Sequence, residues 1–178
     1  GPVDHLFAMP VLLEHFKSQL DPETLTVVSP DMGRVRVADI WSDKLGAPLA
    51  IIHKRRDPKI HNDVSIHEIV GDVAGRVCLL VDDMIDTGRT IAKAAQALKD
   101  AGAISVIVAA THAVFSEPAS TVLQSDFIDE VVVTDTLPLD VSKHWDRLRI
   151  LPIAPLLARA IKEVFEDGSV TSMFDGAA

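Results

Sequence analysis

An uninterrupted apolar run, Val77-Cys78-Leu79-Leu80-Val81, constrains the fold of this chain more than any other stretch. A strand with one face in water alternates apolar and polar residues, whereas a continuous run must be covered on both faces, as in a parallel sheet between helices. An alanine-rich helical pattern, IAKAAQALKDAG, follows a few residues later and is closed by Gly102. We therefore predict an α/β fold in which ligands bind beyond the carboxyl ends of the strands.

The rest of the chain reads as strands and helices in alternation. Strands are predicted at residues 25–29, 48–53, 104–111, 130–134 and 148–151, and helices at 3–20, 34–45, 118–124 and 153–165. Alternation of Val64 and Ile66 with polar residues predicts a flexible, hairpin-like loop after the strand at 48–53. His112, Asp135 and Thr136 follow later strands, so they are expected near the same edge of the sheet. The length of 178 residues fits one domain, residues 1–178.

Two carboxylates, Asp82 and Asp83, come at the end of the apolar run. The turn that leads from them into the helix reads Asp86-Thr87-Gly88-Arg89-Thr90. Its glycine accepts unusual backbone angles, its threonines offer hydroxyls, and the helix start supplies free N–H groups at the positive end of the helix dipole. This combination suits a phosphate, while the carboxylates suit sugar hydroxyls or a hydrated Mg²⁺. The implied ligand is a phosphorylated sugar; the alternative is an acidic strand end with an ordinary helix cap.

Two further loops carry residues with related chemistry. Asp31 and Gly33 lie between a predicted strand and helix, which is typical of a phosphate or metal loop, or of an Asp N-cap with a turn glycine. A basic run, Lys54-Arg55-Arg56-Asp57-Pro58-Lys59, follows the strand at 48–53. Arginine can bind phosphoryl oxygens with two parallel hydrogen bonds and lysine supplies a compact charge, so the run predicts a mobile arm that closes over phosphates. The alternative is a solvated basic loop.

Charge and cysteine content exclude some classes of protein. The formal net charge of −9 argues against a general nucleic-acid or membrane-surface binder, and no apolar run has membrane-spanning length. The single cysteine, Cys78, lies in the central apolar run, which is typical of a small buried hydrophobic residue. One cysteine cannot form a disulfide within the chain, which fits a reducing cytoplasm.

The string VDDMIDTGRT at residues 81–90 resembles the ribose-phosphate-binding motif of the type I phosphoribosyltransferase fold. Three further segments resemble one group with that fold, the ribose-phosphate pyrophosphokinases (phosphoribosyl pyrophosphate synthetases), and their actinobacterial branch in particular. These segments are VVSPDMGRVRVADIW, HKRRDPKIHNDVSIHEIVGDVAGR and FEDGSVTSMFDG. They match in order and spacing, which is more specific than any one of them alone. The resemblance implies a three-layer α/β fold with a mostly parallel sheet.

The resemblance also implies an activity, the formation of phosphoribosyl pyrophosphate and AMP from ribose 5-phosphate and ATP with Mg²⁺, for nucleotide biosynthesis. The 2- and 3-hydroxyls of the sugar would bind to Asp82 and Asp83. The 5-phosphate would bind to the turn and helix start, at Asp86, Thr87, Gly88, Arg89 and Thr90.

Other parts of the resemblance imply catalytic, metal and regulatory roles. Lys54 and Arg56 match catalytic-loop residues, and Asp31 matches an aspartate beside the Mg²⁺. The tail that includes Ser169, Thr171 and Ser172 matches an inter-subunit regulatory site for phosphate or ADP. The family implies a homo-oligomer, namely a hexamer.

This chain resembles only the C-terminal half of the family's two-domain chain. The absent N-terminal half supplies much of the ATP site, partly from a neighbouring subunit, so a non-catalytic fragment that binds sugar phosphate is one alternative. A type I phosphoribosyltransferase is the other, because it shares the sugar-phosphate loop. The basic run, the SPDMG loop and the serine-rich tail favour the synthetase. Two residues depart from the family: Arg34 stands where a second glycine is frequent, and Arg89 where a small residue is usual.

Overall fold

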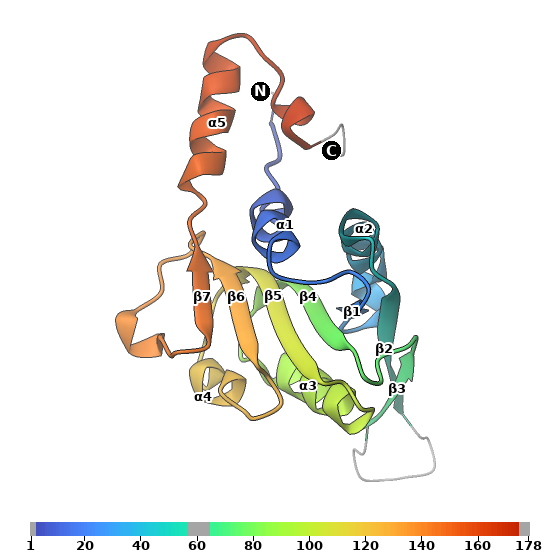
Figure 1. The fold of residues 1–178 in the computed structure, drawn as a ribbon. Coiled ribbons are helices and arrows are strands. Elements are labelled where there is room, and N and C mark those ends of the chain that lie inside the picture. The colour runs from blue at the N-terminus through green and yellow to red at the C-terminus, as the bar shows by residue number, and fades with distance from the viewer. Residues whose placement is uncertain (1–2, 57–64, 175–178) are drawn as a thin grey trace.

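A single mostly parallel sheet forms the centre of the described residues, which are 3–56 and 65–174, with side chains except at 54–56 and 65–67. Its strands in this computed structural model are β1 (Leu25–Ser29), β2 (Leu49–Arg56), β3 (Ser65–Val70), β4 (Val77–Ile85), β5 (Ser105–Ala113), β6 (Glu130–Thr134) and β7 (Leu148–Leu151). They are ordered β3-β2-β1-β4-β5-β6-β7 (Figure 1). β2 and β3 pair antiparallel, and the other neighbours pair parallel.

Helices cover both faces of this sheet. The α-helices are α1 (Met9–Lys17), α2 (Val35–Leu45), α3 (Arg89–Asp100), α4 (Ala119–Leu123) and α5 (Ala154–Phe165), and the 3₁₀ helices are η1 (Met32–Arg34), η2 (Val141–Lys143) and η3 (Val170–Phe174). α1 and α2 lie on one face, and α3 and α4 on the other (Figure 1). The predicted three-layer α/β arrangement is therefore confirmed. Among the described helices, none is long and apolar enough to cross a bilayer.

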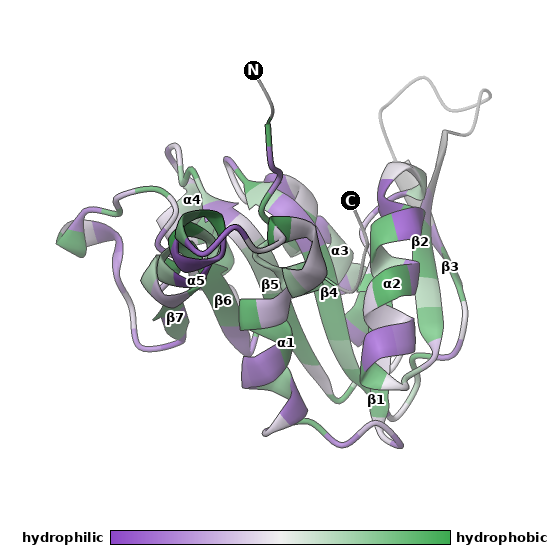
Figure 2. Cartoon of the chain, turned by 90° about the horizontal axis from the view of Figure 1, so that it is seen from above, coloured by the Kyte–Doolittle hydropathy of each residue, from purple (hydrophilic) through white to green (hydrophobic). Residues whose placement is uncertain are grey.

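The core consists of two apolar layers, one on each side of β4. Cys78 and Leu80 face the layer that α3 and α4 cover, whereas Leu79 and Val81 face the layer under α1 and α2. Seen from the α1–α2 side, the strands beneath these helices are largely hydrophobic (Figure 2). Successive side chains of a strand point to opposite faces, so an apolar run without alternation serves both layers at once. The prediction drawn from the run at residues 77–81 is confirmed.

Cys78 is fully buried within this core. Burial raises the pKa of its thiol to about 11, against smaller lowering effects from Arg76 and Lys99. A thiol with a raised pKa is a poor nucleophile, because the thiolate is the reactive form. Cys78 therefore has the predicted role of a small buried hydrophobic residue.

Several elements differ in length from the prediction, and α1 and β4 are the most informative. α1 begins at Met9, whereas the sequence pattern predicted a helix from residue 3. Pro10 occupies the first turn of α1, where proline needs no N–H partner; inside a longer helix it would break a hydrogen bond. β4 continues past the apolar run to Ile85, since its parallel pairing with β5 extends to Ile85↔Ala113. The two acidic residues predicted at the strand end thus lie within the strand.

α5 stands apart from the sheet with η3 beside it (Figure 1). Ala160 of α5 packs in a small cluster with Val170, Met173 and Phe174 of η3. The other apolar side chains of this helix are much more exposed, as Ile161 at 69% and Phe165 at 88% show. α5 therefore contributes little to the main core of this chain.

Candidate functional site

The candidate site begins where β1 stops and β4 continues. The pairing between these strands ends at Val28↔Leu80, while β4 runs on to Ile85 beside β5. Beyond Leu80, the side of β4 that faces β1 is therefore met by the loop after β1, which contains η1. β1 and β4 are parallel, so their carboxyl ends point to the same edge of the sheet. Because β1 is shorter, the loop that follows it lies beside the last residues of β4, among them Asp82 and Asp83.

Asp82 and Asp83 form an acid pair at this edge. Their side chains are 16% and 40% exposed, respectively. The backbone N–H of Asp83 donates to Asp82 Oδ1 over 2.8 Å, and that of Met84 donates to Asp83 Oδ1 over 2.9 Å. Burial raises the pKa of Asp82 from its usual 3.8 to about 6; the negative charge of Asp83 adds to this, while the Asp83 backbone N–H and Arg34 oppose it. The pair offers carboxylate oxygens to a hydrogen-bond donor or a cation.

Arg34, the last residue of η1, bridges the acid pair. Its Nη2 lies 2.7 Å from Asp83 Oδ2, and its Nε lies 3.5 Å from Asp82 Oδ1. In the sequence, Arg34 stands out only as a departure from the family, and this contact is not predicted. No local signal could have found it, because 48 residues separate Arg34 from Asp82.

The turn after β4 leads directly into α3, as predicted. Gly88 caps the helix with a φ of 72°, a left-handed conformation that favours glycine. A Cβ at this position would lie 3.0 Å from Leu123 Cγ of α4. Packing against α4, as well as the turn, therefore favours glycine here. Thr87 is half-buried, and the other members of the turn, Asp86, Arg89 and Thr90, are exposed.

The first N–H groups of α3 lie where the sequence predicted anion binding. Four N–H groups at a helix start lack partners within the helix, and the helix dipole is positive there. The hydroxyl-bearing turn and these groups lie next to the acid pair along the chain. The arrangement can therefore bind a ligand that carries a phosphate at one end and hydrogen-bond donors at the other.

The loop after β1 contains Asp31, the predicted metal residue. Its Oδ1 accepts hydrogen bonds from Gly33 N (2.7 Å) and Arg34 N (3.1 Å), so Asp31 is the N-cap of η1. This is the N-cap arrangement that the sequence also allowed. Asp31 is exposed, and within residues 3–56 and 65–174 no group of three or more His, Cys, Asp or Glu side chains could hold a metal.

The two predicted catalytic residues, Lys54 and Arg56, lie at the end of β2. Their backbone belongs to the antiparallel pair with β3, where Lys54↔His67 and Arg56↔Ser65 are partners. The predicted hairpin-like arrangement is thus present. Their side chains, and the rest of the basic run at residues 57–59, lie outside the described part of the structure.

A small polar cluster lies at the ends of β5 and β6. His112 Nδ1 is 2.9 Å from Thr136 Oγ1, and this hydroxyl and that of Thr134 donate to the carbonyl of Thr111. The Asp135 backbone pairs with His112, while its side chain points toward α5, because Oδ1 accepts the N–H of Ile153. The expected closeness of His112, Asp135 and Thr136 is confirmed. Asp135 helps to attach α5 to the sheet.

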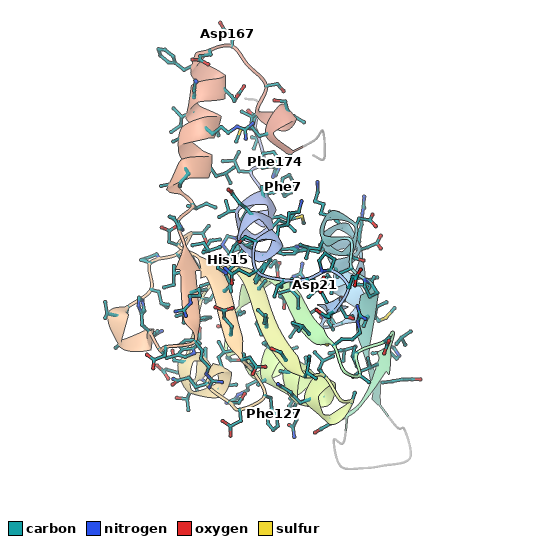
Figure 3. All side chains as sticks on the ribbon, in the orientation of Figure 1. Phe7, His15, Asp21, Phe127, Asp167 and Phe174 are labelled. Atoms are coloured by element: carbon teal, nitrogen blue, oxygen red, sulfur yellow. The ribbon has the colours of Figure 1, made fainter. Side chains whose placement is uncertain are left out.

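The predicted regulatory tail forms η3. Ser169, Thr171 and Ser172 are exposed, and Ser172 Oγ donates to the Ser169 carbonyl over 2.6 Å. Their neighbour Phe174 is buried and meets Phe7 edge to face, with 5.3 Å between ring centroids (Figure 3). The tail is thus anchored to the N-terminal segment by aromatic packing, with its hydroxyls outward.

Comparisons with known proteins relate this chain to one family. Residues 56–175 match the family described as Phosphoribosyl synthetase-associated domain. The ribose-phosphate pyrophosphokinase of Streptomyces coelicolor is 59% identical over 175 residues, 98% of this chain and 54% of that protein. The enzyme of the same name from Corynebacterium efficiens is 54% identical over 179 residues, 100% of this chain and 55% of that protein.

A solved structure agrees with these sequence matches. The crystal structure of phosphoribosylpyrophosphate synthetase from Mycobacterium smegmatis superposes with a TM-score of 0.85 at 49% identity, covering 94% of this chain and 54% of that one. The chain spans about half the length of the relatives it matches. These relatives are actinobacterial, as the resemblance implied. The chain belongs to the ribose-phosphate pyrophosphokinase family, through its phosphoribosyl synthetase-associated domain.

Proposed function

We propose that the protein to which this chain belongs transfers the pyrophosphoryl group of ATP to the 1-hydroxyl of ribose 5-phosphate. The products are phosphoribosyl pyrophosphate and AMP. The proposal rests on one observation above all: a relative named ribose-phosphate pyrophosphokinase is 59% identical over 175 residues, which is 98% of this chain. The same name distinguishes this activity from that of a phosphoribosyltransferase, which the sugar-phosphate turn alone would not.

In the reaction, the 1-hydroxyl oxygen attacks the β-phosphorus of ATP. A new bond forms between that oxygen and the β-phosphorus, the bond from the β-phosphorus to the oxygen bridging to the α-phosphate breaks, and AMP leaves with that oxygen. The hydroxyl proton passes to solvent or a base. Phosphoryl chemistry of this kind needs positioning and charge neutralisation more than covalent help from the protein.

Residues of this chain have distinct tasks in the proposal. The turn and the start of α3 hold the 5-phosphate, and Asp82 and Asp83 accept hydrogen bonds from the 2- and 3-hydroxyls. Lys54 and Arg56 meet the negative charge that shifts between the β-phosphorus and AMP. This division is supported by the geometry of the acid pair beside the turn.

Mg²⁺ is part of the proposal. Asp31 is the candidate ligand, because Mg²⁺ prefers oxygen ligands and is commonly held by one or two carboxylates together with waters and substrate phosphates. Asp31 is exposed and lies in the loop that also carries Arg34. When bound, the ion would neutralise charge on the phosphates of ATP.

The activity is tested by incubating the protein with ribose 5-phosphate, ATP and Mg²⁺ and measuring AMP. Chain 1–178 and the full-length protein are assayed side by side, because the chain covers about half of its relatives. A parallel reaction contains phosphoribosyl pyrophosphate and free bases. AMP formation supports the proposal; release of pyrophosphate in the base reaction alone would show a phosphoribosyltransferase instead.

The sugar-phosphate site is tested by binding. The double variant Asp86→Ala and Thr90→Ala should weaken ribose 5-phosphate by about 2–4 kcal/mol, the scale of losing contacts to a charged ligand. Asp100→Ala is the matched control, since Asp100 is an exposed carboxylate at the opposite end of α3. Equal affinities of the double variant, control and wild type in calorimetry would contradict the assignment.

The roles of Lys54 and Arg56 are tested by kinetics of the full-length protein. Alanine at either position should lower kcat by about two to four orders of magnitude, while ribose 5-phosphate affinity stays within about threefold. The reason is that these cations would engage only as charge develops in the transition state. A parallel loss of binding and rate would refute the catalytic role.

Assembly, regulation and location complete the proposal. We expect a homo-oligomer, a hexamer, in which Ser169, Thr171 and Ser172 help to bind a regulatory phosphate or ADP between subunits; their exposure in η3 is consistent with this. Light scattering and phosphate titration of activity measure both. The single cysteine fits a reducing compartment, and the cytoplasm is the proposed location.

A further inference from the structure

Arg34 contacts both carboxylates of the acid pair at the proposed sugar site. Its Nη2 is 2.7 Å from Asp83 Oδ2, and its Nε is 3.5 Å from Asp82 Oδ1. Two backbone N–H groups already donate to Asp82 Oδ1 and Asp83 Oδ1. At least three of the four oxygens of the pair therefore carry a contact from the protein itself. A ligand with hydroxyl donors must compete for these oxygens.

The backbone of Arg34 is fixed, but its side chain can leave. Asp31 Oδ1 accepts the Arg34 N–H and the Gly33 N–H, which closes the turn of η1. A Cβ on Gly33 would lie 3.1 Å from Asp31 Oδ1, so the turn is tight. The Arg34 side chain is 39% exposed, which leaves a path toward solvent. The loop thus holds the guanidinium at the pair without burying it there.

The contact has a physical reason in the free protein. Asp82 and Asp83 are adjacent carboxylates, and the negative charge of Asp83 raises the pKa of Asp82. A guanidinium shared between them offsets that repulsion. In the shorter contact, the side chains of Arg34 and Asp83 are 39% and 40% exposed. An ion pair exposed to this degree is weak, so a ligand can break it at small cost.

We propose that Arg34 is a built-in competitor for the hydroxyl groups of the sugar phosphate: its guanidinium holds the Asp82–Asp83 pair in the free protein and leaves the pair when the sugar binds. The inference rests on the proposed function of the same site. In this proposal Arg34 lowers the affinity for the sugar phosphate, whereas an arginine that bound the phosphate directly would raise it.

The test compares Arg34→Gln with Arg36→Gln, a matched loss of one positive charge on α2, where Arg36 is exposed. Arg34→Lys keeps the charge but loses the fork of the guanidinium. Affinities for ribose 5-phosphate and for inorganic phosphate are measured by calorimetry, after circular dichroism has shown that each variant is folded. Inorganic phosphate reports on the turn and α3 alone, since it has no sugar hydroxyls.

Arg34→Gln should bind ribose 5-phosphate about two- to fivefold more tightly than Arg36→Gln, the factor that corresponds to a broken, partly exposed ion pair. The ribose 5-phosphate affinity of Arg34→Lys should lie between those of Arg34→Gln and the wild type. Inorganic phosphate should bind the two glutamine variants with equal affinity. Equal or weaker ribose 5-phosphate binding by Arg34→Gln, with wild-type binding intact, overturns the inference alone. If no variant and not even the wild type binds ribose 5-phosphate, the proposed sugar site fails, and the inference fails with it.

Discussion

The raised pKa of Asp82 predicts that removing its charge stabilises the protein at neutral pH. Burial is the largest cause of the rise, from 3.8 to about 6, and the neighbouring Asp83 charge adds to it. The side chain is only 16% exposed, so solvent does little to relieve the cost of its charge. Asp82→Asn keeps the shape and removes the charge.

The sign and size follow from linkage between proton binding and folding. Since the folded-state pKa lies above the unfolded one, the native state holds this proton more tightly. The resulting stability is fully present below the unfolded pKa of 3.8 and is lost as the pH rises through about 6. The interval between these values corresponds to about 3 kcal/mol. The loss of the Arg34 contact acts in the opposite direction, so we expect Asp82→Asn to gain about 1–3 kcal/mol at neutral pH.

The assay is urea unfolding of wild type and Asp82→Asn from about pH 4 to about pH 8, without divalent cations. The two proteins should be equally stable at the acidic end, and the variant should become progressively more stable as the pH rises through about 6. The reasoning would be refuted if the free energies of unfolding of the two proteins differed by the same amount at every pH. It would also be refuted if Asp82→Asn were less stable than the wild type at neutral pH. Either result would mean that Arg34 and the backbone N–H groups compensate the charge of Asp82 fully.

Two further predictions concern the supports of the site. Gly88→Ala should cost about 1–2 kcal/mol for its left-handed backbone and about 1 kcal/mol more for crowding at Leu123, whereas Gly75→Ala, with a φ of 70° and nothing within 4 Å, should show only the backbone cost. Equal losses of urea stability in the two variants would contradict the packing argument. Asp129→Asn should cost about 1–2 kcal/mol near pH 7, because Asp129 Oδ2 accepts hydrogen bonds from Lys99, Ser105 and Val106. Burial opposes ionisation of Asp129, but these hydrogen bonds lower its pKa overall. The difference in stability between wild type and Asp129→Asn should therefore shrink as the pH falls through that lowered pKa. A stability difference independent of pH would exclude the ionic contribution.

Strands with strong local patterns could be predicted from the sequence to the residue. β1, β6 and β7 have the predicted bounds, because short runs rich in apolar residues are bounded by residues that disfavour a strand, such as Pro30, Asp135 and Pro152. The length of β4 could not be predicted, since the residues Asp82 and Asp83 have low strand propensity. Pairing with β5 determines where β4 ends. That pairing joins residues 28 positions apart in the chain, such as Asp82↔Ala110.

The chemistry of the turn was also readable, because each part is local: a glycine with positive φ, hydroxyls and a helix start within five residues. The second reason for glycine at position 88 is its closeness to Leu123. This contact could not be predicted from the sequence, since Leu123 lies 35 residues further along the chain. A glycine in a turn of this kind therefore does not by itself show that a ligand approaches it closely. In this chain, the side chain of Leu123 already favours glycine at the position.

The acid pair and Arg34 show how strand length creates a site that residue patterns do not contain. β1 ends at the level of Leu80, and β4 carries its two carboxylates past that level. The edge so exposed must find donors, and the tight turn capped by Asp31 brings the guanidinium of Arg34 to it. A longer β1 would pair with this edge of β4. It would then exclude both the guanidinium and the proposed sugar ligand from the edge. The same shortfall of β1 thus supplies both the binding edge and the side chain that occupies it in the free protein.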